Sequence, residues 1–323
     1  MGERKERVAV IGPGTMGCGI ALCFAQEGYE VHLVGRSEER LKDAMARICS
    51  WVEDLRREGI ISDPQLVLGA VKTHTDLREG AEEATFVIEA IPEDIKRKKE
   101  LFQIMDKLCP PVTIFATNTS SLSISEMASV TSRPDRFLGT HFWNPAHLIP
   151  LVEVIRGDKT SEETIDLVVG FLRKVRKEPV VVKKDVPGFI GTRLHQALIR
   201  EAFHIVEQGI ASIEDVDRVV KYSFGRRLAV TGPFETCDLG GLDVFLSVAE
   251  QWRFLSDAKG PSWLLRKKVE EGKLGAKTGE GFYVWDKERL RKVAEERERM
   301  LIYFMKREGR WNWNVKDVDS GRT

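Results

Sequence analysis

A glycine-rich turn near the start of the chain is the feature that most limits its possible folds. The segment GPGTMG at residues 12–17 follows the apolar run VAVI, and a helix-forming stretch follows it as far as Gly28. Glycines at this spacing let a strand turn sharply into a helix and let the backbone approach a pyrophosphate at the helix N-terminus. The alternative is a turn that only joins strand to helix. The pattern predicts a dinucleotide site that includes Gly12, Gly14, Thr15, Met16 and Gly17.

Apolar runs alternate with helix patterns through the first half of the chain. Strands are expected within residues 8–12, 31–35, 85–91, 113–120, 136–142 and 150–157. Helices are expected from the glycine turn to residue 28, over 37–59, over 94–108 and from Ser123 onward. This alternation predicts an α/β fold with a doubly wound, mostly parallel sheet of the Rossmann type.

The pattern changes near residue 184, after which only helices are expected, beginning with a long amphipathic helix over residues 189–206. We therefore predict a dinucleotide-binding domain over 1–184, an all-helical substrate and dimerisation domain over 185–290, and a charged helical tail over 291–323. The tail contains Trp311 and Trp313.

Charge and composition narrow the range of partners. The chain has 323 residues, with 50 Lys and Arg against 50 Asp and Glu, so no excess of positive charge favours nucleic acid or an anionic membrane. No apolar run approaches the ~18 residues that span a bilayer. The five cysteines show no metal-ligand spacing, so no metal is expected, and reduced thiols in the cytoplasm are the simplest interpretation.

Polar and glycine residues stand where the predicted strands end. In chain order these residues are Gly12, Gly35, Arg36, Ala90, Ile91, Asn118, Ser120 and His141. Ligands of an open α/β sheet bind beyond the carboxyl ends of its strands. The strand ends therefore place Ser120, His141 and Asn144 beside the cofactor crevice.

An acid, Glu153, lies inside the apolar run LIPLVEVI, twelve residues after His141. A charge among aliphatic side chains is costly unless it is paired. We expect Glu153 to pair with His141, whose place at a strand end favours a functional role over that of a core histidine. The alternative for Glu153 is an edge-strand charge that faces solvent.

Six segments together resemble the 3-hydroxyacyl-CoA dehydrogenase family. They are GPGTMGCGIA, VIEAIPED, TNTSSLSI, HFWNPAHLIPLVEVI, KDVPGFIGTRL and GEGFY, and the resemblance covers residues 6 to 285. It implies NAD or NADP as cofactor, an acyl-CoA substrate of fatty acid metabolism and a homodimer formed through the helical domain. It also implies that His141 is the catalytic base, that Glu153 orients it, and that Ser120 and Asn144 contact the reacting oxygen. Glu93 and Lys98 are expected to join the cofactor site, and Thr192 the substrate site.

Some positions depart from the family pattern. Thr192 stands where the family often has asparagine, and PAHLIPLVEV resembles the related lambda-crystallin/L-gulonate and carnitine dehydrogenase branches. His147, within that segment, is expected at the surface. The segment GKLGAKTGEGFYVW at residues 272–285 resembles the acyl-CoA enzymes instead. The leading hypothesis is therefore a 3-hydroxyacyl-CoA dehydrogenase, with a dehydrogenase of free 3-hydroxy acids and a non-catalytic crystallin-like protein as alternatives.

The end of the second strand bears on the choice between NAD and NADP. Enzymes that prefer NAD commonly place an acid there, where it binds the ribose hydroxyls. Here Gly35 and Arg36 occupy that place. Because arginine binds phosphate well, we expect NADP to be accepted. The alternative is that Glu38 or Glu39 contacts the ribose and that NAD is preferred.

Overall fold

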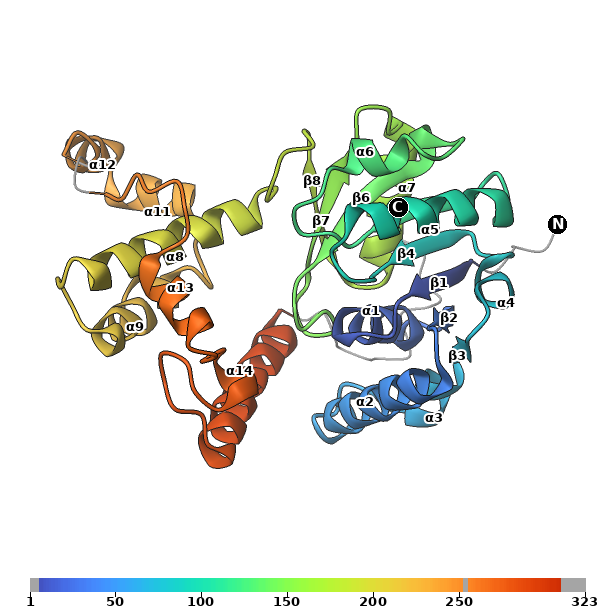
Figure 1. Cartoon of the computed structure of the whole chain (residues 1–323), viewed down its shortest axis with the longest axis horizontal. Helices are drawn as coiled ribbons and strands as arrows, with labels where there is room; N and C mark the ends of the chain where they lie inside the picture. The colour runs from blue at the N-terminus through green and yellow to red at the C-terminus, as the bar shows by residue number, and fades with distance from the viewer. Residues whose placement is uncertain (1–5, 252–254, 309–323) are drawn as a thin grey trace. The chain divides into compact units, whose positions relative to one another are not determined.

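A computed structural model describes residues 6–251 and 255–308 (Figure 1). Within these residues, eight strands form one sheet in the order β3-β2-β1-β4-β5-β6-β7-β8. The strands are β1 (Arg7–Ile11), β2 (Glu30–Val34), β3 (Val71–His74), β4 (Phe86–Glu89), β5 (Ile114–Thr117), β6 (Phe137–Phe142), β7 (Leu151–Arg156) and β8 (Glu178–Val182). All neighbouring strands are parallel except β6 and β7. The predicted doubly wound, mostly parallel fold is confirmed, and β3 and β8 are additional strands.

Helices cover both faces of this sheet. They are α1 (Thr15–Gln26), α2 (Glu38–Arg57), α3 (Pro64–Gly69), α4 (Leu77–Ala81), α5 (Ile95–Leu108), α6 (Ile124–Ala128) and α7 (Glu162–Lys174), with a 3-10 turn at Pro134–Arg136. Side chains of β1 alternate between two buried clusters. Val8 and Val10 pack in the cluster that contains α1, α2 and α7, and Ala9 and Ile11 pack in the cluster that contains α4, α5 and α6. This alternation buries both faces of the sheet, as expected for a parallel sheet.

The helical part of the chain forms a second compact unit, over residues 191–295. It contains α8 (Gly191–Glu207), α9 (Ile213–Tyr222), α10 (Phe224–Arg227), α11 (Pro233–Gly240), α12 (Leu242–Ala249), α13 (Trp263–Glu270), a 3-10 turn at Ala276–Thr278 and the start of α14 (Lys287–Arg307). An all-helical second unit after the sheet is what the sequence predicts.

The boundaries of the units differ from the expected ones. The first unit continues to Ile190 rather than ending at residue 184, because Phe189 is buried and the Ile190 N–H donates to Glu153. Residues 296–308, the last that the structure describes, belong to the first unit rather than to a separate tail. Ile302 and Met305 of α14 are buried in its core. Trp311 and Trp313 lie outside the described residues.

Candidate active site

The glycine turn packs β1, α1 and the end of β4 closely together. Gly12 has a φ of 119°, and a Cβ there would lie 2.6 Å from the Ala90 carbonyl oxygen. A Cβ on Gly17 would lie 1.8 Å from the Gly12 carbonyl oxygen. Both positions therefore require glycine.

The N-terminus of α1 is open to a ligand. Its N-cap residue, Gly14, makes no side-chain capping bond, and a Cβ on Gly14 would have no atom within 4 Å. Open space in front of free helix N–H groups suits a pyrophosphate. The turn that contains Thr15 and Met16 therefore fits the dinucleotide predicted from the sequence.

The residue that follows β2 is a glycine, Gly35, for a packing reason. A Cβ on Gly35 would lie 2.7 Å from a side-chain atom of Pro13. Arg36 follows it and is exposed. The Ser37 side chain accepts a hydrogen bond from the Arg40 N–H and caps α2. Close packing against Pro13 therefore explains the glycine at position 35. Exposed Arg36 remains available to a bound nucleotide.

His141 and Glu153 meet, as the sequence predicts. They lie directly opposite each other on the antiparallel strands β6 and β7. The His141 Nδ1 lies 2.8 Å from the Glu153 Oε2, and both residues are buried, at 6% and 1% exposed. The solvent-facing alternative for Glu153 is therefore wrong. Because a carboxylate only accepts, Nδ1 carries a proton, and in the neutral form of the ring the lone pair is therefore on Nε2.

Two more donors hold the Glu153 carboxylate. The Trp143 Nε1 donates to Oε2 at 3.3 Å, and the Ile190 N–H donates to Oε1 at 2.9 Å. The rings of Trp143 and Phe189 both lie near the His141 ring, with centroids 5.5 and 5.8 Å from its centroid. The buried charge is thus hydrogen-bonded at both oxygens, as a buried charge must be if the fold is to tolerate it.

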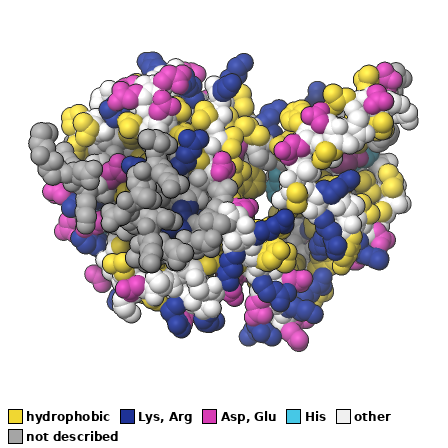
Figure 2. Space-filling model, turned by 180° about the vertical axis from the view of Figure 1, so that it is seen from behind, with side chains coloured by type: hydrophobic (Ala, Val, Ile, Leu, Met, Phe, Trp, Pro, Cys, Tyr) yellow, Lys and Arg dark blue, Asp and Glu magenta, His cyan; other side chains and the backbone are white. Residues whose placement is uncertain are grey.

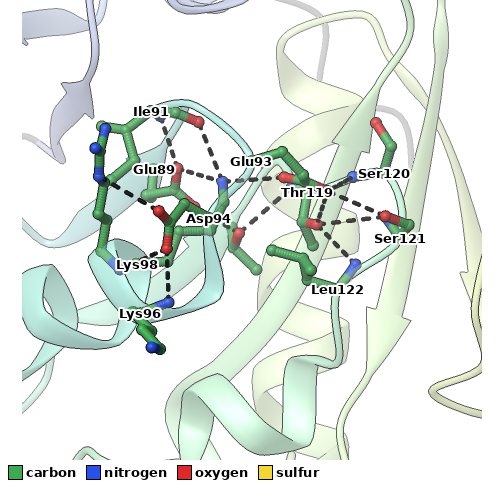
Figure 3. Close-up of polar contacts among 12 residues, drawn as sticks. Glu89, Ile91, Glu93, Asp94, Lys96, Lys98, Thr119, Ser120, Ser121 and Leu122 are labelled. Atoms are coloured by element: carbon green, nitrogen blue, oxygen red, sulfur yellow. Dashed lines mark hydrogen bonds and ion pairs between the residues drawn. The ribbon is translucent and has the colours of Figure 1, made fainter.

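A second buried acid, Glu89, lies at the end of β4 (Figure 3). Its Oε1 lies 2.6 Å from the Lys98 Nζ and accepts from the Ile91 N–H at 2.7 Å, and its Oε2 accepts from the Thr117 hydroxyl at 2.6 Å. Lys98 is 1% exposed and also donates to the Ile91 carbonyl at 3.2 Å. Lys98, a predicted cofactor residue, thus ties the chain after β4 to α5.

Glu93 joins this cluster to the chain after β5 (Figure 3). Its Oε2 lies 3.4 Å from the Lys98 Nζ, and its Oε1 accepts from the Thr119 hydroxyl at 2.5 Å and from the Ser120 N–H at 3.1 Å. Burial raises the pKa of Glu93, but these donors and the Lys98 charge outweigh it and lower the pKa below the ordinary value. Glu93 therefore stays ionised and holds the loop that presents Ser120.

Asn118 and Ser120 follow β5, beside β6. The Asn118 Oδ1 accepts from the Phe142 N–H at 2.8 Å, next to His141 in the chain. Ser120 and Asn144 are both exposed, in the segments that follow β5 and β6. Because β5 and β6 are parallel, both segments leave the sheet at the same edge. Thr192 lies in α8, in the second unit, and its substrate contact stays a prediction.

His147 is buried rather than at the surface, so that expectation is wrong. It is 3% exposed, and its ring stacks on Trp51 with centroids 4.3 Å apart. Burial, with the nearby Lys177 charge, lowers the pKa of His147 to about 3. The Lys177 Nζ donates to the carbonyls of Ala146 and Ile149 at 2.6 and 3.1 Å. The segment that carries Asn144 is therefore fixed from two sides.

Sequence reasoning missed Glu89 as a member of the site. An acid stands inside the apolar run VIEAI, which is the signal that revealed Glu153.

Among the described residues, His, Cys, Asp and Glu side chains form no group of three able to hold a metal ion. The described helices include none that is both long and apolar enough to cross a membrane.

Comparisons with known proteins identify the family of the chain. The model of the 3-hydroxyacyl-CoA dehydrogenase NAD binding domain matches residues 7–186, and that of the 3-hydroxyacyl-CoA dehydrogenase C-terminal domain matches 188–285. The human mitochondrial hydroxyacyl-coenzyme A dehydrogenase is 40% identical over 292 residues, which cover 86% of this chain and 90% of that protein.

Another relative has a different printed activity. The 5-formyl-3-hydroxy-2-methylpyridine 4-carboxylate 5-dehydrogenase of Mesorhizobium japonicum is 35% identical over 92% of this chain and 96% of that protein. A crystal structure of a dehydrogenase of this name, described as an NAD⁺-dependent dismutase, has a TM-score of 0.88 at 34% identity and covers 93% of this chain and 97% of its own. On the fold, the glycine turn and both family models, the chain belongs to the 3-hydroxyacyl-CoA dehydrogenase family.

Proposed function

We propose that the protein oxidises C3 of a 3-hydroxyacyl-CoA to a ketone and carries out the reverse reduction, with His141 as acid and base and Glu153 as its partner. The observation that supports this most is the 2.8 Å contact between the two buried side chains. A buried pair of titratable side chains, at the same edge of the sheet as the glycine turn, is typical of a functional site.

In the oxidation, the Nε2 lone pair of His141 takes the proton of the C3 hydroxyl. The C–H electron pair leaves C3 as hydride, and the carbonyl forms. Glu153 stabilises the imidazolium that results, and Ser120 and Asn144 hold the reacting oxygen. A nicotinamide cofactor, when bound, supplies the hydride acceptor. In the reduction, the protonated His141 returns the proton.

The proposed substrate class rests on the chain's similarity to acyl-CoA enzymes. Both family models and the 40% identity to the human enzyme favour a CoA thioester. The segment GKLGAKTGEGFYVW points the same way. The chain has 50 Lys and Arg and 50 Asp and Glu, so its net charge favours neither substrate class.

A second candidate substrate is a small carbonyl compound that carries a carboxylate. The Mesorhizobium relative favours it, because its similarity extends over 92% of this chain whereas the family models end at residue 285. A hydrated aldehyde has a hydroxyl and a hydrogen on one carbon, so the same base takes the hydroxyl proton as hydride leaves that carbon. Free 3-hydroxy acids such as L-gulonate and L-carnitine belong to the same class, that of acids that are not linked to CoA.

Two further proposals concern the cofactor and the assembly. Exposed Arg36 supports acceptance of NADP beside NAD. The second unit supports a homodimer, since many of its large apolar side chains are exposed, including Leu194 at 60% and Phe234 at 85%. Apolar side chains stand at the surface beside charges of both signs in Figure 2. The five free thiols are in keeping with the cytoplasm.

The test is a spectrophotometric assay of cofactor oxidation and reduction. Acetoacetyl-CoA is supplied with reduced cofactor, and L-gulonate, L-carnitine and 5-formyl-3-hydroxy-2-methylpyridine 4-carboxylate with oxidised cofactor, each beside a His141→Ala control. We expect kcat/KM to be highest for acetoacetyl-CoA. A kcat/KM that is a hundredfold higher for any acid not linked to CoA would favour the second candidate class instead. Binding of the cofactor without turnover of any substrate would favour the crystallin-like alternative.

A further inference from the structure

The linker that joins the two units is anchored in the first unit before it leaves. At its start, the Asp185 Oδ2 accepts from the Ser123 hydroxyl at 2.8 Å and from the Ser125 N–H at 2.9 Å. At its end, the Ile190 N–H donates to the Glu153 Oε1 at 2.9 Å, and the next residue begins the second unit. The linker therefore ends on the carboxylate that holds His141.

The backbone between these anchors contains an unusual residue. The Phe189 N–H donates to the Val186 carbonyl at 3.1 Å and closes a turn in which Gly188 has a φ of 77°. Phe189 follows with a φ of 48°. A bulky side chain in the left-handed region is a conformational outlier that costs free energy. Such a cost persists where the surrounding structure imposes it, commonly at a functional site.

The side chain of Phe189 shows what holds this conformation. It is 2% exposed, and its ring lies 5.8 Å from the His141 ring. Phe189 thus contacts the histidine through its ring, while its left-handed backbone turns the following N–H toward the glutamate. Phe189 and the residue after it therefore contact both members of the pair.

We propose that Phe189 is a positioning residue of the acid–base pair. Its left-handed backbone aims the Ile190 N–H at Glu153, and this backbone conformation, rather than the bulk of its ring, sets the alignment of the pair. The alignment of the pair then depends on the chain segment that enters the second unit. This inference rests on the proposed roles of His141 and Glu153.

Two substitutions separate the backbone from the packing. Glycine adopts a left-handed φ freely, whereas the β-branched valine resists it but keeps more apolar volume. We expect kcat for acetoacetyl-CoA reduction to fall less than about fivefold in Phe189→Gly and at least tenfold in Phe189→Val, with KM for the cofactor within twofold in both. A role in packing alone predicts the opposite order and would overturn the proposal. If Phe189→Val does not fold, Phe189→Ala replaces it, because alanine also resists this φ.

A double-mutant cycle tests whether the effect passes through Glu153. In a Glu153→Gln background, the further substitution Phe189→Val should lower kcat less than about twofold, because the aligned carboxylate is already absent. Independent, multiplicative losses would contradict the proposed route.

A readout that needs no turnover separates this inference from the proposed function. The proton on the His141 Nδ1, bonded to Glu153, should give a downfield NMR signal that Phe189→Gly retains and Phe189→Val loses or shifts. Retention of an unchanged signal in both variants would refute the positioning role. The expected NMR result in a protein that turns over none of the substrates would refute the proposed function alone.

Discussion

His147 offers a prediction that can be worked out from its environment. Its pKa is lowered from 6.5 to about 3 by burial and by the Lys177 charge. The folded state therefore keeps the ring neutral at pH values where the unfolded chain protonates it. Between pH 6.5 and about 3 the unfolded state binds more protons, so the free energy of unfolding must fall as the pH falls.

The magnitude follows from the width of this window. Unfolding free energy changes by up to ~1.4 kcal/mol for each unit of pH within it. Between pH 6.5 and pH 4, His147 alone should therefore remove about 3 kcal/mol. The free energy of unfolding of a typical domain is only ~5–15 kcal/mol. A loss of this size is therefore measurable.

Urea unfolding from pH 7 to pH 4, at fixed protein concentration, measures this contribution. His147→Phe keeps a ring against Trp51 and removes the titrating group, so its stability should fall with pH by about 3 kcal/mol less than that of the wild type. His195→Gln, at an exposed position in α8, is the matched control and should follow the wild type. If the free energy of unfolding falls equally with pH in His147→Phe and in the wild type, His147 is not a buried neutral ring.

Three further outcomes are expected. Lys98→Met should destabilise the protein by ~3–5 kcal/mol in urea unfolding because it strands buried Glu89, and the added change Glu89→Gln should recover part of the loss; no loss would show that the pair is dispensable. Arg36→Ala should lower kcat/KM for NADPH more than for NADH, and a hundredfold NADH preference left unchanged by the substitution would exclude Arg36 as a phosphate ligand. Light scattering at micromolar concentration should give about twice the 36.6 kDa chain mass, whereas the mass of one chain would contradict the dimer.

The sequence predicts the sheet well where strands are long, apolar and bounded by glycine. It misses β3 and β8 for physical reasons: VKTH at 71–74 contains three polar residues, and EPVVV at 178–182 contains a proline. Within sheets, proline is confined mainly to edge strands, and β8 is one of the two edge strands of this sheet. A charged helix is found near the end of the chain, as predicted, but its packing into the first unit depends on tertiary contacts of Ile302 and Met305.

Local rules predict one half of the candidate site better than the other. The meeting of His141 with Glu153 follows from one acid in an apolar run, because such a charge needs a partner. The same rule applied to VIEAI would have found Glu89. The burial of His147 could not be predicted, because it depends on Trp51, which lies far away in the chain. The left-handed Phe189 gives no local signal either, since aromatic residues rarely adopt that conformation.

The central claim is that His141 transfers the proton in the proposed reaction. It is tested most directly by measuring kcat for acetoacetyl-CoA reduction in the wild type and in His141→Ala, together with the Kd of the reduced cofactor by fluorescence. General acid–base catalysis contributes ~10²–10⁴-fold, so kcat should fall by at least a hundredfold while the cofactor Kd stays within twofold. A His141→Ala enzyme that keeps more than about a tenth of the wild-type kcat would contradict the role of His141.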